Sequence, residues 1–186
     1  MPKAYKMFRV IKKEKGKLFP LFVDSNTSTP IGIWIEAKEG EKTESGKVKS
    51  KLGPLCFRPG WHLSDIPLAI HIGVKDKTGK IVAMNSKHVW CECEYEDTIN
   101  YQEEANLNGT KNGEVIPKFA YLKKVPKNGY YRYKTNPNML GEWIIAGNIK
   151  ILKVLSDKDV ADILTEKGYK IMPRDGGEIN LVDYGF

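Results

Sequence analysis

The chain has 186 residues, of which 41% are hydrophobic and 28% are charged, and its net charge at pH 7 is +7. This length is enough for one well-buried core, and the composition excludes disorder over most of the chain. Because no apolar run approaches the roughly 18 residues of a membrane-spanning helix and the N-terminus lacks the apolar stretch of a secretion signal, we expect a cytoplasmic protein without a membrane partner.

The first hundred residues predict short strands that are separated by turn-forming residues. The first three strands are expected at residues 6–12, 17–23 and 31–37. Residues 38–51 have no apolar periodicity, so we expect an exposed loop there. After a strand that ends at Phe57, a short helix is expected from Ser64 to Ile72, with Ser64 as its N-cap.

The second half of the chain predicts more strands and one well-defined helix. Strands are expected at residues 80–83, 88–95, 117–123, 129–133, 142–145 and 149–155, and a helical turn is expected at 100–107. Ser156 and Asp159 resemble a capping box, which predicts a helix near 157–167 that ends at Gly168. We therefore expect one α+β domain over 1–168, with a mostly antiparallel sheet, two or three short helices, and a loosely docked tail at 169–186.

The chain has three cysteines, Cys56, Cys91 and Cys93. An odd number this small does not make a disulfide framework. With His88, the two thiols of Cys91 and Cys93 could bind a metal ion, but a structural zinc site needs four ligands and no second Cys/His pair follows. We therefore interpret Cys91 and Cys93 as small buried core residues and expect no metal site.

Charge is distributed unevenly along the chain. The segment 118–134 contains tyrosines and no acidic residue, and its cations are Lys118, Lys123, Lys124, Lys127, Arg132 and Lys134. The segment 92–104 contains six acidic residues and no basic one. Cations interleaved with aromatic rings suit a phosphate backbone with stacked bases, which favours a nucleic acid as the partner, RNA before DNA. The alternative is a solvated strand pair whose tyrosines fill one face of a sheet.

All three histidines precede residue 90, and two of them flank a segment rich in chemically reactive side chains. His62 and His71 could act as base and acid in RNA cleavage without a metal ion or another cofactor. The phosphorane then needs positive charge, which Arg58 and Lys134 could supply. Hydrogen bonds to the phosphate are expected from Tyr131 and Thr135, and Asp65 could orient a histidine. The alternative is that His62 caps a turn and His71 is a satisfied core histidine.

Two short stretches resemble ADP-ribosyltransferases. Glu142, at the start of the segment EWIIAGNI, resembles the late strand that carries the catalytic glutamate of that family. Phe8-Arg9-Val10 resembles the family's first strand. The resemblance implies that Arg9 binds NAD and that Glu142 orients the ribose while nicotinamide leaves. The intermediate Ser-Thr-Ser motif of the family is absent from this chain.

Four further segments resemble a domain found in phages and mobile elements of gut bacteria, often within very large polyvalent proteins. They are 17–23 (KLFPLFV), 47–54 (KVKSKLGP), 58–62 (RPGWH) and 130–138 (YYRYKTNPN), and the similarity covers roughly residues 6–160. The resemblance implies a protein that acts on host or invader macromolecules in the cytoplasm of the host bacterial cell. It names no reaction, and it also suits a counter-defence protein that only binds a host protein.

Three functions follow as hypotheses. The first is a metal-independent RNase that uses His62 and His71. The second is an NAD-dependent ADP-ribosyltransferase that uses Arg9 and Glu142. The third is a basic, non-catalytic protein that presents the segment 118–134 to a nucleic acid or to an acidic host protein.

Overall fold

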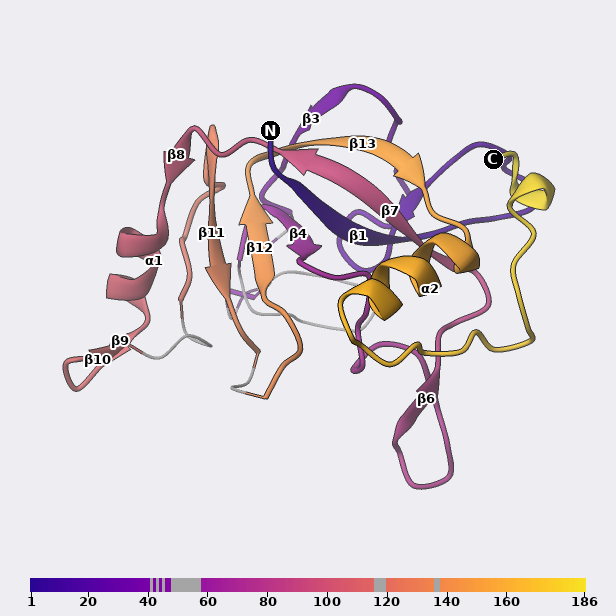
Figure 1. The fold of residues 1–186 in the computed structure, drawn as a ribbon. Coiled ribbons are helices and arrows are strands. Elements are labelled where there is room, and N and C mark those ends of the chain that lie inside the picture. Colours follow the sequence, from indigo (N-terminus) through magenta and orange to yellow (C-terminus); the bar gives the residue numbers. More distant parts are fainter. Residues whose placement is uncertain (41, 43, 45, 48–57, 116–119, 136–137) are drawn as a thin grey trace.

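The computed structural model describes residues 1–40, 42, 44, 46–47, 58–115, 120–135 and 138–186 (Figure 1). Their largest element is a nine-stranded sheet in which every pair of strands is antiparallel except β8 and β11. In spatial order its strands are β3 (Trp34–Glu36), β13 (Asn148–Val154), β7 (His88–Tyr95), β1 (Lys3–Arg9), β4 (Trp61–Ser64), β12 (Trp143–Ala146), β11 (Gly129–Tyr133) and β8 (Ile99–Asn100), with β2 (Phe19–Pro20) paired to β1.

Two small hairpins and three helices complete the described part of the chain. The hairpins are β5 (Val74–Lys75) with β6 (Ile81–Ala83), and β9 (Thr110–Lys111) with β10 (Glu114–Val115). The helices are α1 (Gln102–Asn108), α2 (Asp157–Glu166) and the 3₁₀ helix η2 (Leu181–Tyr184). The predicted fold class, a single α+β domain with a mostly antiparallel sheet, is thereby confirmed. None of the helices seen in the described ranges is long and apolar enough to cross a membrane.

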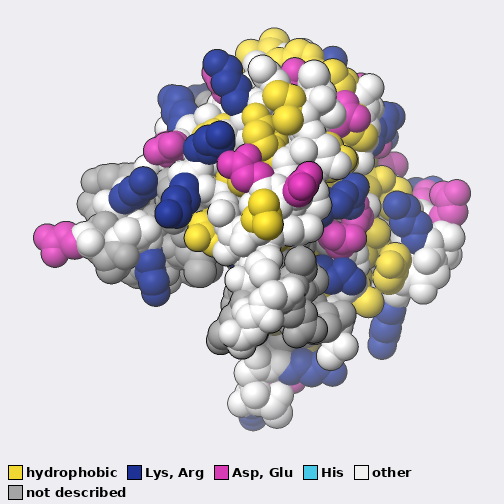
Figure 2. Space-filling model, turned by 90° about the vertical axis from the view of Figure 1, so that its left-hand side faces the viewer, with side chains coloured by type: hydrophobic (Ala, Val, Ile, Leu, Met, Phe, Trp, Pro, Cys, Tyr) yellow, Lys and Arg dark blue, Asp and Glu magenta, His cyan; other side chains and the backbone are white. Residues whose placement is uncertain are grey.

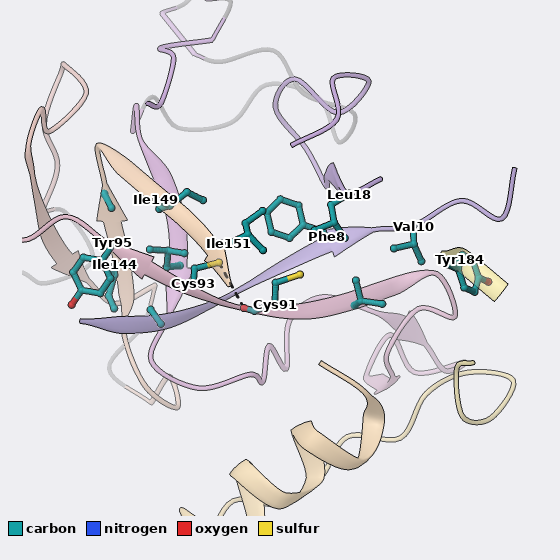
Figure 3. Close-up of a cluster of buried hydrophobic side chains, with 14 residues drawn as sticks. Phe8, Val10, Leu18, Cys91, Cys93, Tyr95, Ile144, Ile149, Ile151 and Tyr184 are labelled. Atoms are coloured by element: carbon teal, nitrogen blue, oxygen red, sulfur yellow. Dashed lines mark hydrogen bonds between the residues drawn. The ribbon is translucent and has the colours of Figure 1, made fainter. Parts of the chain in front are cut away.

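The central strands of the sheet are buried on both faces. On one face, side chains from β1, β7, β12 and β13 form the main core, which contains Phe8, Cys91, Cys93, Ile144 and Ile151 (Figure 3). On the other face, Met7 and Trp90 pack with the half-buried apolar side chains of α2. In β7, Val89, Cys91, Cys93 and Tyr95 alternate along the strand and fill the main core, while Trp90 is buried on the other face.

Helix α2 begins where its capping box was predicted. The Ser156 hydroxyl accepts a hydrogen bond from Asp159 N at 3.1 Å, and the Asp159 carboxylate accepts one from Ser156 N at 3.1 Å. Two backbone N–H groups that have no partner within the helix are satisfied in this way. At the other end, Gly168 has a φ of 78°, a left-handed conformation that ends the helix.

We expect Ser156→Ala to lower the free energy of unfolding by about 1 kcal/mol, because alanine cannot accept the hydrogen bond from Asp159 N. Urea unfolding of the variant and the wild type measures this difference. Ser28→Ala, at an exposed serine outside any helix, is the control and should leave the midpoint unchanged. A loss of the same size in both variants would contradict the role of the cap.

The predicted helix from Ser64 to Ile72 is wrong. Ser64 is the last residue of β4, it is 1% exposed, and it pairs with both Tyr5 and Trp143. After it the chain turns without a helix and buries Ile66 and Leu68 against Leu164 of α2. Pairing with two strands and burial of these apolar side chains outweigh the local helical signal.

The tail at 169–186 is firmly docked rather than loose. Arg174 pairs with Met84 in an isolated parallel β-bridge, and Tyr184 is buried in the main core. Gly16 N donates to Tyr184 O at 2.8 Å, so the tail also holds the turn that follows β1. The predicted strand that ends at Phe57, and parts of the expected loop at 38–51 and strand at 117–123, lie outside the described residues.

Candidate functional site

His62 lies in β4 and faces the same side of the sheet as Ile145 and Tyr131, which stand opposite one another in β12 and β11. Its Nδ1 lies 3.2 Å from Gly60 O, which only accepts, so Nδ1 carries the proton. Burial lowers the pKa of His62 to about 3, and the charges of Lys6 and Arg58 contribute to this shift. The imidazole is therefore neutral at pH 7.

His71 follows β4 and is exposed at the surface. Its ring stands edge-on to Trp143, with the ring centroids 5.4 Å apart, and partial burial lowers its pKa. The ring of His62 stands edge-on to Tyr133 at 6.3 Å. Because Tyr133 and Trp143 are opposite each other in β11 and β12, the two histidines flank the same pair of aromatic residues, each on a different ring.

Two more of the predicted residues contact these rings. The Arg58 guanidinium lies 4.2 Å from the centroid of the Tyr133 ring, and its Nε donates to Ala120 O at 3.1 Å. The Thr135 hydroxyl accepts a hydrogen bond from Trp143 Nε1 at 2.9 Å. We call this group the Tyr133–Trp143 cluster. Its members are Arg58, His62, His71, Tyr133, Thr135 and Trp143.

The remaining predicted residues of the RNase site lie elsewhere or have other partners. Tyr131 is fully buried, its hydroxyl accepts from Leu122 N, and burial raises its pKa. Asp65 forms an ion pair with Arg132 at 2.7 Å and also accepts from Glu142 N at 3.1 Å. The partner of its carboxylate is therefore Arg132 and not a histidine. Lys134 directly follows β11 and is half-buried.

The described part of the basic run, 120–134, lies beside the end of the acidic run, 99–104. Strand β8 pairs with β11, and α1 follows β8 with two acidic residues in its first turn. Lys124 and Glu104 form an ion pair at 3.9 Å, whereas Lys123 and Lys127 are exposed. On the face that bears α1, basic and acidic side chains are interspersed (Figure 2). The predicted basic stripe is thus partly neutralised. Lys118 lies outside the described residues.

Arg9 and Glu142 do not share a cleft. Arg9 ends β1, where its Nη2 donates to Ser25 O at 2.9 Å and its guanidinium lies over the ring of Phe19. Glu142 comes just before β12, whose residue Trp143 lies across β4 from Tyr5. Four residues along β1 separate Tyr5 from Arg9, a distance of about 13 Å. The NAD-binding arrangement implied by the sequence resemblance is therefore not formed.

Cys91 and Cys93 are buried in the main core, and burial raises the pKa of both thiols. His88 points to the other face of β7. It pairs with Arg9 of β1, whose side chain points away from the main core that holds Phe8 and the two cysteines. In the described ranges, no group of three or more His, Cys, Asp or Glu side chains could hold a metal ion.

Sequence reasoning missed Tyr133 and Trp143, the two residues at the centre of the cluster. Tyr133 is the last residue of β11 and Trp143 is the first residue of β12, so each lies at one end of a strand that was predicted. Pairing these two strands in the right register would have placed the rings opposite each other. No local pattern in the sequence indicates that pairing.

No protein family model, no curated protein and no solved structure matches this chain. The similarity to a phage and mobile-element domain therefore stays a prediction. What the protein does has to be inferred from its own residues.

Proposed function

We propose that the protein binds single-stranded nucleic acid, with RNA as the favoured ligand, through the Tyr133–Trp143 cluster. The observation that carries this proposal is the placement of a guanidinium and an exposed imidazole against two neighbouring aromatic rings on one face of the sheet. Trp143 is half-buried and can stack on a base, whereas Tyr133 is 9% exposed and supports the Arg58 guanidinium. Cations beside a stacking ring contact the phosphate backbone. The net charge of +7 adds a sequence-independent attraction to polyanions.

Binding is better supported than cleavage. General acid–base catalysis works best when the pKa of the catalytic group is close to the working pH. The pKa of His62, at about 3, is far from this range, and its Nδ1 proton is held by Gly60 O. Asp65 and Tyr131 are engaged elsewhere. Of the two histidines proposed for catalysis, His71 alone is exposed, and one titrating imidazole does not supply both acid and base.

We expect Trp143→Ala to weaken the binding of a short labelled single-stranded RNA roughly 5- to 150-fold, the loss of one stacked base. Fluorescence anisotropy at fixed low salt measures the dissociation constants. The control is Trp34→Ala, which removes an exposed tryptophan on the edge strand β3, away from the half-buried Trp143, and should leave the affinity unchanged. Equal losses in both variants, or no binding by the wild type, would contradict the proposal.

The same protein samples distinguish binding from cleavage. After incubation with RNA in EDTA, we expect the RNA to remain intact with the wild type. Cleavage by the wild type that disappears in the His62→Ala/His71→Ala double variant would overturn the binding-only proposal in favour of a metal-independent RNase. A polybasic binder with cytoplasmic nucleic acid as its target also fits the phage setting expected from the sequence.

A further inference from the structure

Two residues that are opposite each other in neighbouring strands each bury a side-chain nitrogen without a hydrogen-bond partner. The two atoms are Arg9 Nε and His88 Nδ1, and both are shielded from solvent. Arg9 and His88 are opposite each other in the β1–β7 register, so their side chains are neighbours on one face of the sheet. In the described part of the chain only one other buried side-chain polar atom, Asn148 Oδ1, lacks a partner. Buried polar atoms nearly always have partners, so two adjacent exceptions indicate a ligand.

The Arg9 side chain is held in place while part of its binding capacity stays unused. Its Nη2 donates to Ser25 O at 2.9 Å, and Phe19 supports the guanidinium at 5.2 Å from the ring centroid. Within the described residues, Arg9 forms no ion pair with a carboxylate. Arg9 and His88 are each half-buried as whole residues, so the rim of the site reaches solvent. A fixed guanidinium without a counter-charge is a ready anion-binding group.

A neighbouring arginine increases the positive potential at this site. The pKa of His88 is lowered to about 4, mainly by burial, with contributions from the charges of Arg174 and Arg9. The imidazole is therefore neutral at pH 7 and can present an N–H to an anion. Arg174 itself is occupied, because it forms an ion pair with Asp157 at 2.9 Å and donates to His88 O at 2.6 Å. Its positive charge attracts an anion to the site, but its own N–H groups already donate to protein acceptors.

We propose that Arg9 and His88 form a binding site for a small oxyanion, with inorganic phosphate as its simplest ligand. Arg9 Nε–H and His88 Nδ1–H are the donors, and the guanidinium supplies the charge. The site lies where β1 ends and β7 begins, on the sheet face that carries α2 (Figure 1). It is separate from the Tyr133–Trp143 cluster and does not depend on nucleic-acid binding.

Nuclear magnetic resonance of the three histidine rings tests this proposal directly on the folded wild type. Titration with inorganic phosphate at constant ionic strength should shift the ring nitrogens of His88 in a saturable way and leave those of His62 unchanged. Chloride over the same range is the reference for ionic strength. Acetate shows whether a carboxylate is accepted as well. If neither phosphate nor acetate gives a saturable shift, the proposal is overturned, and water is then the partner of Arg9 Nε and His88 Nδ1.

Two variants with the same change in charge identify the role of Arg9. Arg9→Gln should abolish the phosphate-dependent shift of His88, whereas Lys13→Gln, at an exposed lysine in the turn after β1, should retain it. Arg9→Lys keeps the charge but not the Nε–H, and its affinity should fall at least tenfold. Trp143→Ala should bind phosphate like the wild type. If Arg9→Gln and Lys13→Gln weaken phosphate binding equally, net charge alone explains the binding and the proposed site is overturned.

Discussion

Replacing Arg174 by alanine is expected to lower the free energy of unfolding by about 3–5 kcal/mol. The side chain is 5% exposed, and its Nε and Nη2 donate to the carboxylate of Asp157. Its Nη1 donates to three carbonyl oxygens, those of Asn85, Ser86 and His88. Alanine would leave a partly buried carboxylate without its charge partner and would remove the Arg174 donor from these carbonyls, which is the costly way to break a buried ion pair.

Urea unfolding followed by tryptophan fluorescence measures the loss. Lys158→Ala is the control, because it removes an ion pair with Asp162 in which both side chains are mostly exposed, and no measurable change is expected. Arg174→Lys should give an intermediate loss, since an ammonium keeps the charge but cannot form the two-pronged contact with Asp157. A loss below about 1 kcal/mol in Arg174→Ala would show that the tail does not depend on this anchor.

Stability is expected to fall steeply as the pH drops from 6.5 towards 3, with His62 as a principal cause. The folded protein holds this group with a pKa of about 3, whereas the unfolded chain takes up a proton near pH 6.5. In this window the unfolded state binds more protons, so stability rises with pH. The contribution of His62 is fully present above pH 6.5 and is lost as the pH falls through the window, by a few kcal/mol at most.

His62→Gln separates this effect from other titrating groups. The variant cannot take up the proton, so the decrease of its unfolding free energy between pH 6.5 and 3 should be shallower than that of the wild type. His88, whose pKa is lowered to about 4, titrates in the same window and keeps contributing in both proteins. Identical pH slopes in the two proteins would contradict the shifted pKa of His62 and would reopen its use as a catalytic acid or base.

Local sequence signals predicted the elements whose stabilising contacts are local. The strands His88–Tyr95 and Gly129–Tyr133 have the predicted bounds, because alternating burial repeats every two residues and turn-forming residues end the runs. The helix Asp157–Glu166 was predicted because its capping box joins residues only three apart. The short strands β5, β8, β9 and β10 were missed, since two residues are too few to show a period.

The candidate site depended on contacts between residues far apart in the chain. Arg58 contacts Tyr133, and His71 contacts Trp143, only because β4, β12 and β11 are neighbours in the sheet. The pairing of the acidic run with the basic one, which weakens the basic stripe, likewise follows from β8 lying beside β11. Strand order and register are decided by burial and by hydrogen bonds between distant segments, and no short window of sequence contains both partners.

The sequence by itself determined the fold class, the longer strands, the capped helix and the basic character of this protein. Tertiary structure decided that Ser64 ends a strand instead of beginning a helix, because two neighbouring strands satisfy its backbone. It also decided that His62 is neutral and that Arg9 lies beside His88, since burial and strand register set the pKa of the one and the neighbour of the other. Both are collective properties of the packed sheet, which individual residues acquire only when the whole chain has folded.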